Sequence, residues 1–427
     1  MSGVQMKEIP ASNLDELWAN FDPMRPLDPD SPFKIVRKRK IGSEYADINR
    51  RWLRDLARSS EPKAWYLTGH RGCGKSTMLR GLLADQRVQE KYLPIHFAIQ
   101  DRTDRQDLQY QEVLFAIAAA LIEQAIACQA VSEAMQKRLD TWARTVTHYE
   151  EHKQGFSLDT EAGAGVNFLH ALLAKFMLKL QREHKTREIF RHTIEPQVSE
   201  LINIIDEVTQ AIENKTSKMP LVAIDDLDKP NLERARAIFG DHAQDLEQPQ
   251  CHIIYTVPVA LLHDTAVTNI GSDVWYLPNV KIYHRGPQKK RSDVGFATMQ
   301  DFLSKRINSE ASLMSTEATE ALIRFSGGVF RQMCSLVQRA VDIALDQDKA
   351  CIDEGDIQIA ANELQNDLVL QLDERDIAFL ATLSREKSAA VPHDYLHLLH
   401  NLTALRYLND HYWHDVNPLL DSFLFSE

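Results

Sequence analysis

Eight consecutive residues, Gly69–Ser76 (GHRGCGKS), have the types and spacing that bind phosphate. They match G-x-x-x-x-G-K-[ST] in full, where glycines let the backbone approach phosphate and point its N–H groups inward. Lys75 can reach the β- and γ-phosphates, and the Ser76 hydroxyl can bind Mg²⁺. A strand-like run (AWYLT) precedes the loop and a helix-like run (STMLRGLL) follows it, as this motif requires. We therefore expect a nucleotide site formed by Gly69, His70, Arg71, Gly72, Cys73, Gly74, Lys75, Ser76 and Thr77.

Two adjacent acids, Asp225 and Asp226, end the apolar run LVAIDD. A buried strand would carry them to its C-terminal end, where α/β sheets bind ligands. Alone, the pair would indicate a solvated acidic turn. Beside a phosphate loop, we expect Asp225 to hold Mg²⁺ with Ser76, and Asp226 to polarise the attacking water.

Two shorter patterns fit the same chemistry. Thr256 ends the strand-like HIIYT, where its hydroxyl could lie beside the γ-phosphate; the alternative is an ordinary threonine at a strand end. Arg331 follows the Gly–Gly turn of SGGVFR and could reach the γ-phosphate from a helical lid; the alternative is a surface arginine.

Together, GHRGCGKST, VAIDDLD, IIYT and SGGVFR resemble the AAA+ and STAND class of P-loop ATPases over about residues 40–427. Within that class the chain is most similar to origin-recognition-like (ORC/CDC-type) bacterial ATPases, which carry a winged helix after the lid. The resemblance implies ATP and Mg²⁺ as cofactors and assigns roles to individual residues. Lys75, with Ser76 or Thr77, would bind nucleotide and Mg²⁺. Asp225 would bind the metal, and Asp226 would be the catalytic acid. Thr256 would be the first sensor and Arg331 the second.

One departure from that class concerns the catalytic acid. Many AAA+ motors have glutamate where this chain has Asp226. A shorter side chain lies farther from the attacking water, which implies slow hydrolysis suited to a switch.

The expected fold class is α/β: a P-loop NTPase of the ASCE/AAA+ type, with a parallel sheet, a large helical insertion, a helical lid and a C-terminal winged-helix-like module. Five apolar runs predict strands: AWYLTG, YLPIHFAIQ, PLVAIDD, CHIIYT and VWYLPNVKIYHR. A helix is predicted over 43–58, and residues 1–33, which contain four closely spaced prolines, are expected to form loop.

Four domains are predicted in chain order. They are an N-terminal loop or arm at 1–42, an ATPase core at 43–292, a helical lid at 293–368 and a winged-helix-like domain at 369–427. The core includes a helical insertion at about 109–216, because 150 residues separate Lys75 from Asp225 and roughly 80 of them exceed what strand crossovers need. Ala164–Leu180 could be an amphipathic membrane helix, but its spacing favours a core helix.

The net charge of −12 argues against a generic DNA-coating protein. Residues 31–60 are the exception, with nine bases and three acids, and could dock an anion or an acidic partner. Residues 369–427 contain nine acids and four bases, which favours protein contact over DNA contact for that domain. We expect a cytoplasmic protein with reduced cysteines, because the chain shows no signal pattern, membrane-spanning run or CxxC pair.

Two further groups of residues leave alternatives open. His393, His397 and His400 recur at i, i+4 and i+7, so a zinc site is conceivable, but without a fourth ligand we expect unliganded histidines. Four arginines are candidates to act on a neighbouring subunit's nucleotide, and the sequence does not choose among them: Arg234, Arg236, Arg285 and Arg291.

The sequence therefore predicts an ATP-hydrolysing AAA+/STAND-type switch that forms homo-oligomers and regulates a partner protein, without a membrane role. Phage (antiviral) defence or genome maintenance is the setting that its relatives suggest. One alternative is a DNA-binding ATPase that uses residues 34–58 and the winged helix to load or remodel nucleoprotein complexes. Another is a scaffold that binds ATP without hydrolysing it.

Overall fold

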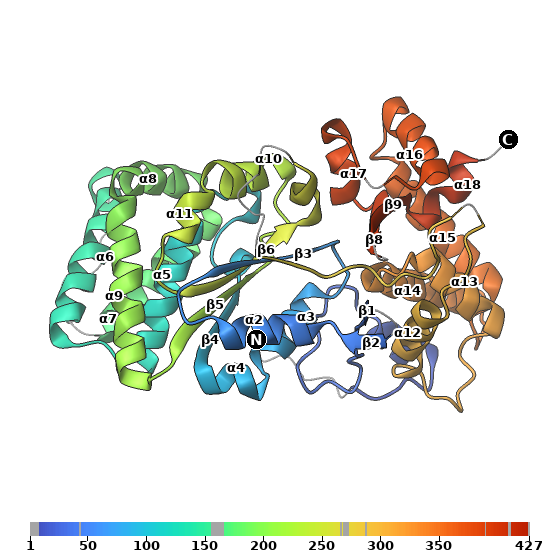
Figure 1. The fold of residues 1–427 in the computed structure, drawn as a ribbon, viewed down its shortest axis with the longest axis horizontal. Helices are drawn as coiled ribbons and strands as arrows, with labels where there is room; N and C mark the ends of the chain where they lie inside the picture. The colour runs from blue at the N-terminus through green and yellow to red at the C-terminus, as the bar shows by residue number, and fades with distance from the viewer. Residues whose placement is uncertain are drawn as a thin grey trace. The chain divides into compact units, whose positions relative to one another are not determined.

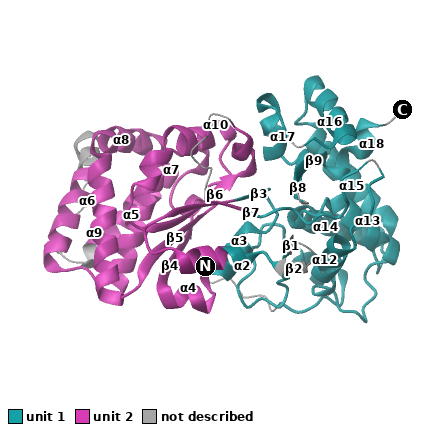
Figure 2. Cartoon of the chain, viewed as in Figure 1, with its two compact units in different colours: residues 1–51, 68–82, 276–427 teal, residues 52–67, 83–275 magenta. Residues whose placement is uncertain are grey.

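The computed structural model describes residues 8–41, 44–154, 166–264, 267, 273–286, 288–388, 390–408 and 411–425. The chain forms two compact units (Figure 2). Unit 1 comprises Met1–Arg51, Thr68–Leu82 and Tyr276–Glu427, and unit 2 comprises Trp52–Leu67 and Leu83–Trp275. The phosphate loop therefore belongs to unit 1, whereas the two acids and the helical insertion belong to unit 2.

A five-stranded sheet has the order β4–β5–β6–β3–β7 (Figure 1). Its strands are β3 (Ala64–Gly69), β4 (Tyr92–Ala98), β5 (Met219–Asp225), β6 (His252–Pro258) and β7 (Val274–Tyr276). The pairs β4–β5 and β5–β6 are parallel. Because parallel strands are covered on both faces, they are continuous apolar runs, and every residue of β6 is buried. The predicted α/β class is confirmed.

The insertion of unit 2 is helical, as predicted. Its helices are α5 (Tyr110–Ala127), α6 (Glu133–Gln154), α7 (Val166–Arg182), α8 (His184–Ile194) and α9 (Val198–Thr216), joined to the shorter α4 (Gln86–Lys91), α10 (Leu232–Arg236) and α11 (Ala243–Glu247). Among the described residues, α5 alone is long and apolar enough to cross a membrane, but most of it is buried inside the unit. In α7, Leu169, Leu173 and Phe176 also lie in the core, which favours the core interpretation of that helix.

Unit 1 combines the N-terminal segment, the phosphate loop with most of α3, and the C-terminal part of the chain. Its elements are α1 (Leu14–Asn20), β1 (Lys38–Ile41), β2 (Glu44–Asp47), the start of α2 (Asn49–Arg58), α3 (Lys75–Leu83), α12 (Asp293–Ser304), α13 (Thr316–Ser326), α14 (Phe330–Asp346), α15 (Glu354–Val369), α16 (Glu374–Glu386), α17 (Leu396–His400), β8 (Ala404–Leu408), β9 (Tyr412–Val416) and α18 (Asp421–Leu424). Strands β8 and β9 form an antiparallel hairpin after α16 and α17. We call residues 1–42 the arm, 293–368 the lid and 369–427 the C-terminal module.

Three local predictions differ from the structure. The segment expected to be loop contains α1, because Asn13 caps it and Leu14 and Leu17 are buried in the core of the lid. The helix predicted over 43–58 begins only at Asn49, since the preceding residues form the β1–β2 hairpin. The last predicted strand is limited to Val274–Tyr276.

Candidate nucleotide site

The phosphate loop joins β3 to α3 and has the backbone that its glycines permit. Gly72 (φ +79°) and Gly74 (φ +97°) lie in the left-handed region, where side chains are strained. A Cβ atom on Gly72 would lie 2.3 Å from the Cβ of Arg331, and one on Gly69 would lie 2.5 Å from the Leu277 carbonyl oxygen. The loop therefore tolerates no side chain at these positions, and its fold fits a phosphate cradle.

Lys75 lies at the start of α3 with its side chain almost fully buried. Its Nζ donates to the carbonyl oxygens of Gly69 (2.8 Å) and His70 (2.9 Å), so the ammonium lies over the loop. The Thr77 hydroxyl accepts a hydrogen bond from the Leu27 backbone N–H (3.1 Å), and the choice between Ser76 and Thr77 as the hydroxyl for Mg²⁺ stays a prediction.

The arm and the lid each contact the loop directly. The buried guanidinium of Arg37 donates to the carbonyl oxygens of Cys73 (2.8 Å) and Pro278 (2.5 Å). From the lid, the Arg331 backbone N–H donates to the Gly72 carbonyl (3.2 Å). The Arg331 side chain points elsewhere, since its Nε donates to the Pro23 carbonyl of the arm (3.0 Å). A sensing role for that guanidinium stays a prediction.

The C-terminal module contacts two further loop residues, His70 and Arg71. The His70 ring accepts a hydrogen bond at Nε2 from the Arg406 backbone N–H (2.7 Å). Burial, followed by the charges of His414, Lys75 and Arg406, holds the pKa of His70 well below its usual value, so the ring is neutral. Arg71 Nη2 lies 2.6 Å from Nε2 of His400. These contacts join loop positions to residues more than 300 positions later in the chain, and no sequence pattern reveals them.

The acids of unit 2 form a compact turn at the end of β5. Both are nearly buried, and the Asp226 backbone N–H donates to a carboxylate oxygen of Asp225 (2.8 Å). Asp226 has φ +68°, which is strained for a residue with a side chain. Lys229 Nζ lies 2.7 Å from Asp226 Oδ1. Burial raises the pKa of Asp226, Lys229 opposes that shift, and the neighbouring charges of Asp225 and Asp228 add to it.

Lys229 is a functional candidate that the sequence reasoning missed. Its signal was the lysine three residues after Asp226, a spacing that lets both side chains meet across one turn.

Thr256 is fully buried and holds that turn in place. Its hydroxyl donates to the Ile224 carbonyl (3.1 Å) and accepts from the Leu227 backbone N–H (3.0 Å), so it spans the acidic pair. These hydrogen bonds fix the turn that carries Asp225 and Asp226, and a sensing role for Thr256 stays a prediction.

Metal binding by protein side chains alone is not indicated. Across the described part of the chain, no three His, Cys, Asp or Glu residues gather as a metal site. His397 instead pairs with Asp376 (2.9 Å), and His393 lies outside α17, so the histidines do not share one helix face. One carboxylate and one hydroxyl suit Mg²⁺, which proteins often bind together with substrate phosphates, so a cation held by Asp225 and Ser76 stays a prediction.

Three of the four candidate arginines are held within their own units. Arg234 lies 3.3 Å from Asp107, Arg236 pairs with Asp264, and Arg291 lies 3.3 Å from Glu320. An action of any of them on a second subunit stays a prediction.

No protein-family model matches the sequence, and no curated protein does. Among solved structures, the chain is similar to Cdc6p from Pyrobaculum aerophilum (12% identity, TM-score 0.37, 93% of this chain and 97% of that one). It is similar to Aeropyrum pernix ORC1, solved in complex with DNA (12% identity, TM-score 0.38, 98% of this chain and 99% of that one). It is also similar to the Thermotoga maritima RuvB Holliday junction branch migration motor (11% identity, TM-score 0.35, 85% of this chain and 90% of that one). Likenesses this distant do not establish a shared family or activity.

Proposed function

We propose that this protein is a Mg²⁺-dependent ATPase of the AAA+/STAND type that works as a molecular switch. The observation that carries the proposal is the set of contacts on its phosphate loop. The arm bonds to Cys73, the lid to Gly72 and the C-terminal module to His70. A ligand that changes the loop therefore acts on three segments distant in sequence, which is what a nucleotide switch requires.

The residues of the chain fit ATP and Mg²⁺ by their chemistry. When bound, the nucleotide would supply the phosphoanhydride that is cleaved, and the cation would neutralise its phosphates. The loop N–H groups and Lys75 would bind the phosphate oxygens. Asp225 and Ser76 would hold the cation, and Thr256 keeps the acidic turn in place.

Asp226 is the proposed base for the attacking water. Lys229 stabilises its carboxylate in the ionised form, which can attract a water proton.

The proposed output is oligomer assembly and regulation of a partner protein, in phage defence or genome maintenance. A DNA-binding ATPase is the second candidate, and one observation favours it. Helix α2 exposes four arginines on the polar side of an amphipathic helix: Arg50, Arg51, Arg54 and Arg58. Stimulation of turnover by duplex DNA, lost on changing Arg54 and Arg58 to Gln, would select this candidate.

The test of the main proposal is nucleotide binding by the full chain. We expect ATP with Mg²⁺ to bind in isothermal titration calorimetry, Lys75→Ala to abolish binding, and Lys185→Ala, an exposed lysine on α8, to leave it unchanged. Equal ATP binding by folded Lys75→Ala protein would refute the site.

A further inference from the structure

One buried arginine of the C-terminal module has unusual surroundings. Arg406 lies on β8 with 6% of its surface exposed. Its guanidinium lies over the rings of Tyr276 (4.7 Å) and Tyr412 (3.8 Å). Among the described residues, its Nε and Nη1 donors have no hydrogen-bond partner.

The other buried arginines of unit 1 each make side-chain hydrogen bonds, although the Nε of Arg306 also has no partner among the described residues. Arg37 donates to the Cys73 and Pro278 carbonyls, and Arg306 donates to the Phe33 and Phe302 carbonyls. These side chains tie segments together. Arg406 makes no such side-chain bond, and a buried donor without a partner costs free energy that native structures rarely leave uncompensated.

A negatively charged group would compensate Arg406, and the backbone of Arg406 lies beside the phosphate loop. The backbone of Arg406 is held between the His70 ring (2.7 Å) and the Tyr276 hydroxyl, which donates to its carbonyl oxygen (3.2 Å). Residue Leu277, next to Tyr276, donates its N–H to the Thr68 carbonyl, immediately before the loop (2.8 Å). Lys75 Nζ donates to the His70 carbonyl oxygen (2.9 Å), so Lys75 and the backbone of Arg406 contact the same loop residue.

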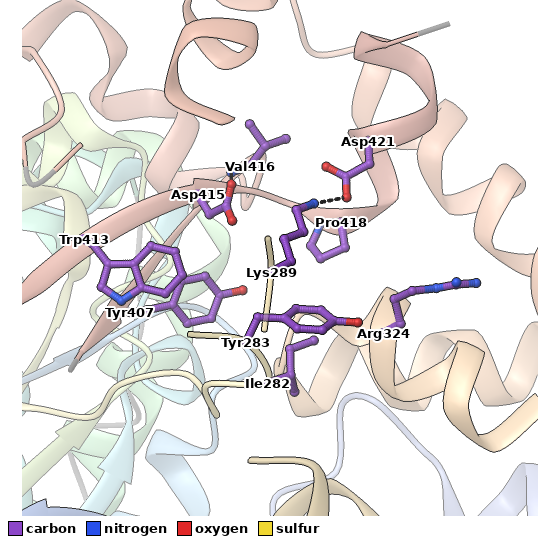
Figure 3. A pocket seen from close by; sticks show the side chains of 10 residues that line it. All are labelled: Ile282, Tyr283, Lys289, Arg324, Tyr407, Trp413, Asp415, Val416, Pro418 and Asp421. Carbon is purple, nitrogen blue, oxygen red and sulfur yellow. Dashed lines mark hydrogen bonds and ion pairs between the residues drawn. The ribbon is translucent and has the colours of Figure 1, made fainter. Parts of the chain in front are cut away.

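The pocket on the other side of the same hairpin shows the contrast (Figure 3). It has a volume of about 60 Å³ and includes Tyr407, which follows Arg406 and faces the opposite side of β8. Its Lys289 is already paired with Asp421 (2.5 Å), and its Asp415 is paired with Lys387. These charges are balanced within the protein, so the pocket does not require an anion, whereas Arg406 does.

We propose that Arg406 is a phosphate-binding residue, carried by the C-terminal module, that contacts the terminal phosphate of a nucleoside triphosphate in the loop. This inference rests on the proposed nucleotide site and names the group that distinguishes ATP from ADP there. It makes the position of β8 depend on the third phosphate, because the backbone of the same residue already bonds to His70. The C-terminal module is thereby the part of the switch that responds to ATP.

The test compares Arg406→Gln, Arg406→Lys and the control Arg375→Gln, an exposed arginine on α16 of the same module. Calorimetry on the full chain with Mg²⁺ measures affinities for ATP, ADP and inorganic phosphate. We expect Arg406→Gln to weaken ATP binding by about ten- to a hundredfold, the usual worth of a charged hydrogen bond, and ADP binding by less than about twofold. Arg406→Lys should recover part of the loss, and Arg375→Gln should match the parent.

The outcomes separate this inference from the proposed function. Retained ADP affinity shows that Arg406→Gln is folded. An unchanged ratio of ATP to ADP affinity, or loss of inorganic phosphate binding alone, would overturn the role of Arg406 while the nucleotide site stands. If the parent protein bound neither nucleotide, the proposed function itself would fail.

Discussion

The phosphate loop and the acidic turn are both short motifs, but the structure holds them in different ways. The acidic turn is fixed from nearby, by Lys229 three residues away and by Thr256 on the neighbouring strand. The loop is fixed from afar, by Arg37 of the arm, Arg331 of the lid and Arg406 of the C-terminal module. Under the proposed function, the locally held turn performs the chemistry and the loop communicates the nucleotide state.

The largest effect is expected at the loop. Lys75→Ala removes the cation that closes over it, so ATP affinity should fall more than about a hundredfold, as for a buried charged contact. Turnover should fall below detection in a phosphate-release assay. Unimpaired turnover in a variant that unfolds at the parental temperature would contradict the assignment.

Variants of the two acids in the acidic turn should affect ATP hydrolysis and ATP binding separately. Asp226→Asn keeps the size of the side chain but removes its charge, so turnover should fall by about 10²–10⁴, the range for a positioned base, while ATP affinity is retained. Asp225→Asn should instead weaken Mg²⁺-dependent binding. Parental turnover in Asp226→Asn would move the role of base to another residue.

Thr256→Val tests whether local support matters for the turn. It removes both hydrogen bonds of the hydroxyl and should destabilise unit 2 by about 1–3 kcal/mol, the cost of a buried unsatisfied group. Turnover should fall about tenfold, because the acids lose their position. Thr256→Ser keeps the hydroxyl and should restore both values; a Ser variant as defective as Val would argue for packing by the methyl group.

Acid pH should lower the stability of both units, and this effect is expected to be smaller than those of the variants above. Burial lowers the pKa of His252 in unit 2 and of His414 in unit 1 to about 4. In the unfolded chain these histidines have a pKa near about 6.5, so the unfolded chain binds more protons as the pH falls below that value. The contribution of each histidine to the free energy of unfolding is therefore fully present above about pH 6.5 and is lost toward pH 4, by at most about 3 kcal/mol. Urea unfolding from pH 7 to pH 4 measures this loss. His252→Phe should reduce the loss in free energy of unfolding of unit 2 between pH 7 and pH 4. An unchanged loss would exclude His252 as its cause.

The sequence was sufficient for strands β3 to β6 and for the local shape of the phosphate loop and the acidic turn because their signals are local, whereas the β1–β2 hairpin was not predicted. Buried parallel strands are uninterrupted apolar runs, and a phosphate loop needs its glycines and lysine within eight residues. Helix α1 was missed because seven residues among prolines give little periodicity.

The partners of His70 and Arg71 could not be predicted from the sequence. Arg406 and His400 lie more than 300 residues away, and only the folding of unit 1 brings them to the loop. The burial that leaves Arg406 without a side-chain hydrogen bond is equally a product of that fold.

Hydrogen–deuterium exchange tests most directly the claim that the loop communicates nucleotide state to the lid and the C-terminal module. The informative amides are Arg331, bonded to Gly72, and Arg406, bonded to His70. Exchange in peptides covering them should differ between ATP and ADP in Asp226→Asn protein, which retains ATP, and should not respond to nucleotide in Lys75→Ala. Identical exchange in ATP, ADP and no nucleotide, in protein shown to bind both, would contradict the account.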